Sequence, residues 1–198
     1  MSPAKLEQHL PTHSSNERRH WDQNRKIDIV NIGAGELYAS QQHELISTLL
    51  GSCVAVCLYD PINKIGGMNH FKLPHPGKEQ LSTIPRANYG SYAIDALIEK
   101  IMGLGGKLSH LRAEVYGGGS VIDGLNSNIG EKNIEFALAY LQQKNIPVTQ
   151  CVVAGTRAQQ IFMHPSSGHV FSVWQGQRSL SETKTAEKIY LEGLLQQN

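Results

Sequence analysis

The feature that most constrains the fold is an uninterrupted apolar run at residues 53–59, which includes the β-branched Val54 and Val56. A short continuous apolar run of this kind predicts a strand that is buried on both faces. Residues 60–64 follow with a proline and an asparagine and predict a turn. A second strand-like segment then occupies residues 65–73. The chain therefore predicts a hairpin with at least one strand inside the core.

The remaining elements are predicted from apolar spacing. Partly alternating or apolar segments predict further strands at residues 27–32, 44–50, 111–116, 148–153, 160–163 and 169–174. Apolar residues at helical spacing predict helices over residues 92–102 and 131–144. Most connections between the strands are too short to contain a crossover helix, which excludes a doubly wound parallel sheet. We expect an α/β protein of the α+β kind, with mixed, largely antiparallel β-sheets flanked by two main helices.

Three segments differ in composition. Residues 1–26 are polar and poor in aliphatic side chains, and we expect a flexible N-terminal tail. Residues 27–175 hold the predicted strands and helices and form one domain, and residues 176–198 form a C-terminal extension with a short apolar segment at residues 189–191.

Charge and hydropathy exclude several functional classes. The net charge of +1 provides no field for nucleic acid, and no apolar run is long enough for membrane insertion. The polar N-terminus lacks the apolar core of a signal peptide, which predicts a cytoplasmic protein. The three cysteines are then expected to be free thiols.

Cys53 and His70 are the candidate catalytic pair. Cys53 follows a Gly51-Ser52 corner at a predicted strand start, where backbone N–H groups without ladder partners can stabilise a thiolate or an oxyanion. A cysteine nucleophile needs a nearby base, and His70 lies on the strand expected to pair beside it. From spacing alone, the bland alternatives stay open: a small buried hydrophobe at Cys53 and a strand-end histidine bonded to backbone at His70.

The other two cysteines suggest core positions. Cys57 has the same strand parity as Cys53, so a shared metal is an alternative, but no Cys-x-x-Cys or His-x-x-x-His unit supports it. Cys151 lies in an apolar segment and is expected in the core. We expect no metal and no organic cofactor.

Residues 47–61 and 66–74 closely resemble the chemoreceptor glutamine deamidase family, CheD. The match continues at Tyr89-Gly90, Gly117-Gly118-Gly119-Ser120, Asn128-Ile129-Gly130 through Asn133, and Gly155-Thr156-Arg157. The resemblance implies a cysteine hydrolase that converts glutamines of methyl-accepting chemotaxis receptors to glutamate. It also implies a fold like the catalytic domain of deamidating toxins.

The resemblance implies roles for three residues. Cys53 corresponds to the nucleophile and His70 to its base, and Ser47 occupies the place where the family usually has a threonine that orients the histidine. Thr48, the next residue, is the alternative. A chemotaxis phosphatase is a further partner that the resemblance allows. A second hypothesis is a non-catalytic regulatory module that binds receptors or that phosphatase.

Overall fold

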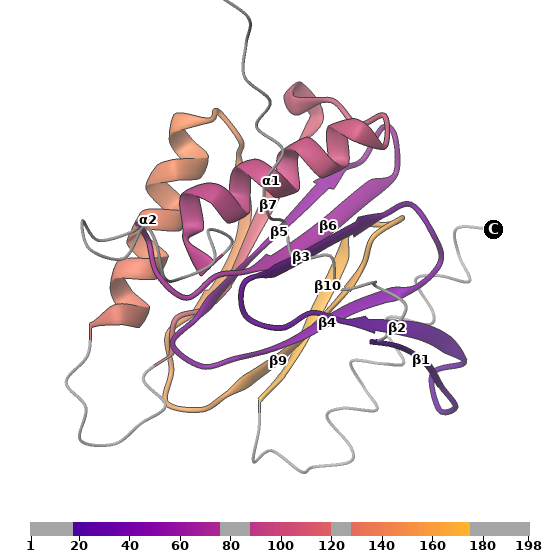
Figure 1. Ribbon diagram of the computed structural model, residues 1–198, viewed down its shortest axis with the longest axis horizontal. Coiled ribbons are helices and arrows are strands. Elements are labelled where there is room, and N and C mark those ends of the chain that lie inside the picture. The colour runs from indigo at the N-terminus through magenta and orange to yellow at the C-terminus, as the bar shows by residue number, and fades with distance from the viewer. Residues whose placement is uncertain (1–17, 76–87, 120–127, 175–198) are drawn as a thin grey trace, which may run out of the picture.

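The computed structural model describes residues 18–75, 88–119 and 128–174, which form two five-stranded sheets and two α-helices (Figure 1). Sheet A contains, in spatial order, β1 (Arg19–Asp22), β2 (Ile27–Asn31), β4 (Leu45–Leu50), β9 (Gln159–His164) and β10 (His169–Trp174). Sheet B contains β3 (Glu36–Ser40), β6 (Ile65–His70), β5 (Val54–Asp60), β7 (Arg112–Gly117) and β8 (Val148–Val153). The helices are α1 (Gly90–Gly103) and α2 (Ile129–Gln143), and a short 3₁₀ turn, η2, spans Leu108–His110.

The strand pairing confirms the expected fold class. β2 and β4 are parallel, as are β7 and β8, and every other neighbouring pair is antiparallel. The two main helices flank these sheets as predicted.

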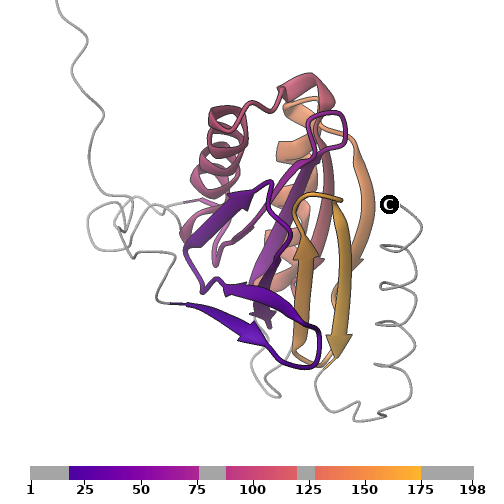
Figure 2. The same cartoon turned by 90° about the vertical axis from the view of Figure 1, so that its right-hand side faces the viewer.

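The molecule has three layers, with sheet B in the middle. Helices α1 and α2 lie together on one side of sheet B, and sheet A lies on the other side (Figures 1 and 2). Val54, Val56 and Leu58 pack toward the helices, whereas Ala55 and Cys57 pack toward sheet A. We call the sheet faces that meet each other the inner faces. Both faces of β5 are covered, which is why its sequence is continuously apolar.

The predicted hairpin is confirmed as β5 and β6, which pair antiparallel with Cys57 opposite Met68. The other predicted strands and both helices are also present, with ends displaced by a few residues. Among the described strands, β1 and β3 have no counterpart in the sequence predictions. β1 is short and mostly polar, and β3 is five residues long with its apolar residues consecutive rather than alternating, so neither has the pattern that reveals a strand.

The predicted tail over residues 1–26 is wrong at β1. Arg19–Asp22 pairs antiparallel with Ile27–Asn31 at the edge of sheet A. Arg19 also forms an ion pair with the buried carboxylate of Glu44, with 2.6 Å between Nη2 and Oε2. Residues 19–22 are thus held in place by backbone pairing and by this ion pair, not by burial of apolar side chains. Residues 1–17 and the predicted extension, including residues 189–191, lie outside the described residues.

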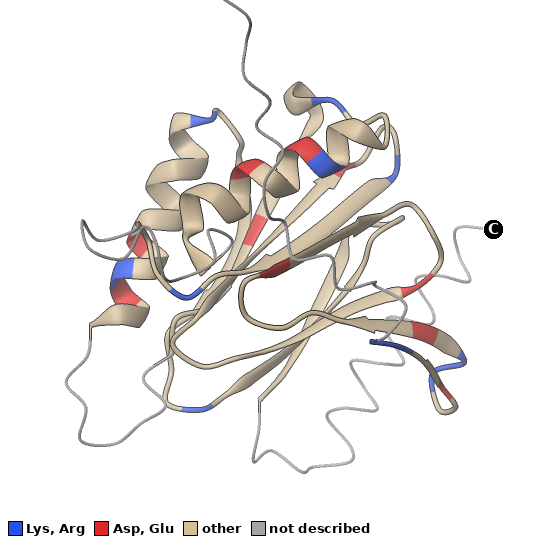
Figure 3. Ribbon diagram, viewed as in Figure 1, with Lys and Arg blue, Asp and Glu red and all other residues tan. Residues whose placement is uncertain are grey.

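Charged residues of both signs are interspersed over the helices and connections that the structure describes (Figure 3). Neither α1 nor α2, the two α-helices of the described ranges, has the length and apolar character needed to cross a bilayer.

Candidate active site

Cys53 lies where the chain crosses from sheet A to sheet B. β4 ends at Leu50, the crossing occupies residues 51–53, and β5 begins at Val54. The Cys53 side chain is half-buried and packs with the cluster between the inner faces. Within the described residues, the backbone N–H groups of Ser52 and Cys53 donate to no backbone carbonyl. Such groups are available to stabilise a negative charge that develops beside the sulfur.

The triple-glycine block, Gly117-Gly118-Gly119 at the end of β7, is hydrogen-bonded to this crossing. The N–H of Gly118 donates to the Cys53 carbonyl at 2.8 Å, and the N–H of Gly119 donates to the Gly51 carbonyl at 2.8 Å. Gly117 has φ +98°, and a Cβ there would collide with the Cys53 carbonyl oxygen. Only glycine allows this conformation and this close approach together. The block is thus a backbone support for the candidate nucleophile.

His70 lies on the same face of sheet B as Cys53. The bridge between Val54 and Phe71 continues the β5–β6 register, so Ala55 stands opposite His70. Opposite residues share a face, and side chains alternate along a strand, so Cys53 points to the face that carries His70. The two are diagonal neighbours across the strand pair. His70 is buried, and its Nε2 has no hydrogen-bond partner among the described residues.

Thr48, not Ser47, contacts the histidine. The Thr48 hydroxyl lies 2.8 Å from Nδ1 of His70. Ser47 is buried on the opposite side of β4, and its hydroxyl accepts a hydrogen bond from Nε2 of Gln160 at 2.6 Å. Alternation along β4 is the reason, because Thr48 shares the inner face with Ile46 and Leu50. The contact expected for Ser47 is therefore made by its neighbour.

The hydrogen bonds of Thr48 determine the tautomer of His70. The single hydroxyl hydrogen of Thr48 is donated to the carbonyl of Ile32 at 2.7 Å. The same hydroxyl can then only accept from Nδ1 of His70, so Nδ1 carries the ring hydrogen. Nε2 is left without a hydrogen, which is the form that a general base needs.

The electrostatics favour a neutral resting pair. Burial, assisted by the Lys72 charge, lowers the pKa of His70 to about 4. Burial raises the pKa of the Cys53 thiol, although Lys72 and the backbone N–H of Cys53 act in the opposite direction. At neutral pH the candidate pair is thus a thiol and a neutral imidazole, and a reaction at the sulfur would require the thiol to give its proton to a base.

Asn133 ties the two halves of the site together. It is fully buried on α2, and its Nδ2 donates to the Ser52 carbonyl at 3.1 Å and to the Lys72 carbonyl at 2.9 Å. One carbonyl precedes Cys53 and the other lies two residues beyond His70. Asn133 therefore fixes the spacing of the segments that carry the candidate pair. Spacing alone did not identify it; only the family resemblance included this residue.

The remaining cysteines lie apart from this arrangement. Cys57 shares the inner face with Cys53 but is fully buried, as predicted, and burial raises the pKa of its thiol well above the ordinary value. Cys151 is exposed, so its predicted core position is wrong. In the part of the chain that the structure describes, no three His, Cys, Asp or Glu side chains are grouped as metal ligands.

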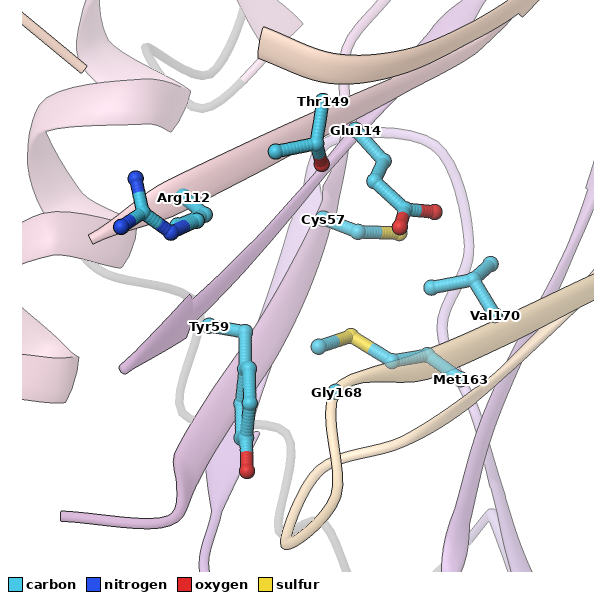
Figure 4. A pocket seen from close by; sticks show the side chains of 8 residues that line it. All are labelled: Cys57, Tyr59, Arg112, Glu114, Thr149, Met163, Gly168 and Val170. Atoms are coloured by element: carbon cyan, nitrogen blue, oxygen red, sulfur yellow. The ribbon is translucent and has the colours of Figure 1, made fainter. Parts of the chain in front are cut away.

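Cys57 lines a small pocket of about 120 Å³ between the inner faces (Figure 4). Neither Cys53 nor His70 lines it. Its walls come from β5, β7, β8, β9, β10 and the turn before β10, through the residues Cys57, Tyr59, Arg112, Glu114, Thr149, Met163, Gly168 and Val170.

Comparison with known proteins decides the family. Residues 72–173 match the model of the family described as CheD chemotactic sensory transduction. A probable chemoreceptor glutamine deamidase CheD 1 from Shewanella oneidensis is 42% identical, over 77% of this chain and 75% of that protein. The chain belongs to the CheD family. Other CheD relatives are the probable chemoreceptor glutamine deamidases of Hahella chejuensis, 41% identical over 77% of this chain and 72% of that one, and of Saccharophagus degradans, 33% identical over 96% and 90%.

The matched CheD range includes the glycine block and Asn133, whereas Cys53 and His70 precede it. Among solved structures, the crystal structure of Bacillus licheniformis hypothetical protein YfiH has a TM-score of 0.38 and 16% identity. It covers 61% of this chain and 51% of that one, a likeness too weak to bear on function.

Proposed function

We propose that this protein is a cytoplasmic protein-glutamine glutaminase that hydrolyses glutamine side chains of methyl-accepting chemotaxis receptors to glutamate and ammonia. The observation that carries the proposal is the His70 ring, held by Thr48 with a bare Nε2 on the face that carries Cys53. The relatives are named as probable chemoreceptor glutamine deamidases, which supports receptor glutamines as the substrate.

The first half of the reaction forms a thioester. Sγ of Cys53 attacks the Cδ carbon of the substrate glutamine while its proton passes to Nε2 of His70. The carbonyl oxygen becomes an oxyanion, which the N–H groups of Ser52 and Cys53 would stabilise. His70 then gives the proton to the leaving nitrogen, and ammonia departs.

The second half consumes one water molecule. Nε2 of His70 takes a proton from the water molecule while the water oxygen attacks the thioester carbon. The bond to sulfur breaks, Cys53 recovers a proton from His70, and glutamate is released. Throughout, the Thr48 hydroxyl accepts from Nδ1 and keeps Nε2 as the working atom.

The product differs from the substrate by one negative charge. Receptor signalling regions resemble long helical bundles, in which an added carboxylate changes the repulsion between neighbouring helices. Deamidation thus has a physical route to shift a signalling equilibrium.

Mass spectrometry of a receptor cytoplasmic fragment tests the proposal. The fragment is incubated with wild type and with Cys53→Ala, and each glutamine is monitored for conversion to glutamate. Conversion with wild type alone is the expected result. Binding of the fragment without conversion by either protein would refute the enzyme and support the regulatory binding module. A chemotaxis phosphatase as a second partner is proposed on the family resemblance alone, and a pull-down with that purified protein tests it.

A further inference from the structure

Gln159 has a buried carboxamide that the catalytic scheme above does not use. Its side chain is 1% exposed, and neither Oε1 nor Nε2 has a hydrogen-bond partner among the described residues. Buried polar groups in folded proteins are nearly always paired, because leaving them unpaired is costly. An amide buried in this way calls for a partner with both a donor and an acceptor.

The register of sheet A places Gln159 on the inner face near the Cys53 crossing. Gln159 stands opposite Leu50, the last residue before the crossing, and opposite residues share a face. Leu50 belongs to the cluster between the inner faces, as does Ile161, two residues beyond Gln159. Thr48 stands opposite Ile161, so it is the diagonal neighbour of Gln159 on this face. Gln159 thus lies beside the residue that orients the base.

A second set of contacts links this position to the nucleophile. A Cβ at Gly117 would lie 3.0 Å from Cδ1 of Leu50 and would collide with the carbonyl of Cys53. The Leu50 side chain, opposite Gln159, therefore lies close to Gly117, which contacts the Cys53 crossing. Cys53 packs against the same cluster as Leu50, so a substrate carboxamide at Sγ would lie at the end of sheet A where Gln159 stands opposite Leu50.

We propose that the Gln159 carboxamide recognises the reacting carboxamide of the substrate glutamine, and this rests on the proposed deamidation. Nε2 of Gln159 donates to the substrate carbonyl oxygen, and Oε1 accepts from the substrate NH₂ group. An ester has no N–H group to donate to Oε1 of Gln159. A carboxylate product would place a second acceptor oxygen against Oε1, which is unfavourable. The pair therefore selects amide over ester and disfavours the product. Gln159 is a specificity-determining residue.

Gln160 offers a matched control. It is the next residue along β9 and has the same side chain, but it lies on the other face, where its Nε2 donates to Ser47. Methionine has nearly the shape of glutamine without its polar atoms. Gln159→Met therefore removes the amide on the inner face of β9, and Gln160→Met removes the amide on its other face.

The experiment compares two substrates with wild type and both variants. The substrates are a receptor fragment with its reactive glutamine and the same fragment with glutamate γ-methyl ester at that position, and kcat/KM is measured for each. Gln159→Met is expected to lower kcat/KM for the amide by about tenfold or more and that for the ester by less than about threefold. Gln160→Met leaves the ratio of amide to ester unchanged.

An equal loss on both substrates, or no loss, would overturn the role of Gln159. Gln159→Leu, with a thermal melt of each variant, guards against a folding defect, because a structural loss lowers both rates together and leaves the ratio unmoved. Failure of wild type to convert the glutamine would overturn the proposed function, and this inference with it. A wild type that converts the glutamine while Gln159→Met keeps the wild-type ratio would overturn this inference alone.

Discussion

The Thr48 hydroxyl lies 2.8 Å from Nδ1 of His70 and donates its own hydrogen to the Ile32 carbonyl at 2.7 Å. A backbone carbonyl can only accept, so the chain of bonds has one direction, from His70 through Thr48 to Ile32. That direction leaves Nε2 of His70 without a hydrogen on the face that carries Cys53.

Replacing Thr48 by valine removes the acceptor without changing the shape of the side chain. We expect Thr48→Val to lower kcat for deamidation by about 10- to 100-fold, because Nδ1 loses the partner that holds its hydrogen. Thr48→Ser should restore most of the rate. Ser47→Ala is the control, since its hydroxyl bonds Gln160 on the other face. A larger kcat loss for Ser47→Ala than for Thr48→Val would refute the assignment.

The pH profile reports the state of His70. Only neutral His70 can act as the base, and its pKa is lowered to about 4, so activity should persist well below pH 6.5 and fall as pH drops through about 4. The measurement is kcat/KM against pH, with circular dichroism at each point to confirm that the protein stays folded. If activity instead fell with a midpoint near pH 6.5, either the pKa of His70 would not be lowered or His70 would not be the base.

Asn133 should matter for both stability and rate. Asn133 is buried and its Nδ2 donates to the carbonyls of Ser52 and Lys72, so Asn133→Leu should lower the free energy of unfolding by about 1–3 kcal/mol, measured by urea titration. We also expect a lower kcat, because the Cys53 crossing is released from the end of the His70 strand. Lys132→Ala, at the exposed position before it, should change neither. Unchanged kcat in folded Asn133→Leu would show that the bonds serve stability alone.

Alanine substitutions at Gly117 and Gly105 distinguish the effect of backbone strain from that of a steric collision. Both have positive φ, +98° and +103°, but a Cβ at Gly105 meets nothing within 4 Å, whereas one at Gly117 meets the Cys53 carbonyl. Gly105→Ala should cost about 1–3 kcal/mol of stability and leave kcat unchanged. Gly117→Ala should additionally abolish most of the activity by displacing Cys53. Wild-type kcat in Gly117→Ala would mean that the block does not position the nucleophile.

Much of the fold could be predicted because burial leaves a periodic pattern. The apolar run of β5 and the helical spacing in α1 and α2 each reflect the faces that they bury. β1 has no such pattern because edge pairing and the Arg19–Glu44 ion pair hold a polar segment. β3 has none because its apolar residues are consecutive, and pairing with β6 makes it a strand. Cys151 was misplaced because an apolar neighbourhood in the sequence does not reveal which strand ends a sheet, and β8 is the edge of sheet B.

The sequence by itself determined the α+β class, the β5–β6 hairpin and the candidate pair Cys53 and His70, since local patterns and family motifs carry all three. Only the tertiary structure decided between Ser47 and Thr48. Residues 45–50 are apolar at both parities, so the sequence does not say which face of β4 turns inward. Pairing with β9 and packing on sheet B turn Thr48 toward His70 and Ser47 toward Gln160. The same parity distinguishes Gln159 from Gln160, because a strand reverses its side chains at every residue.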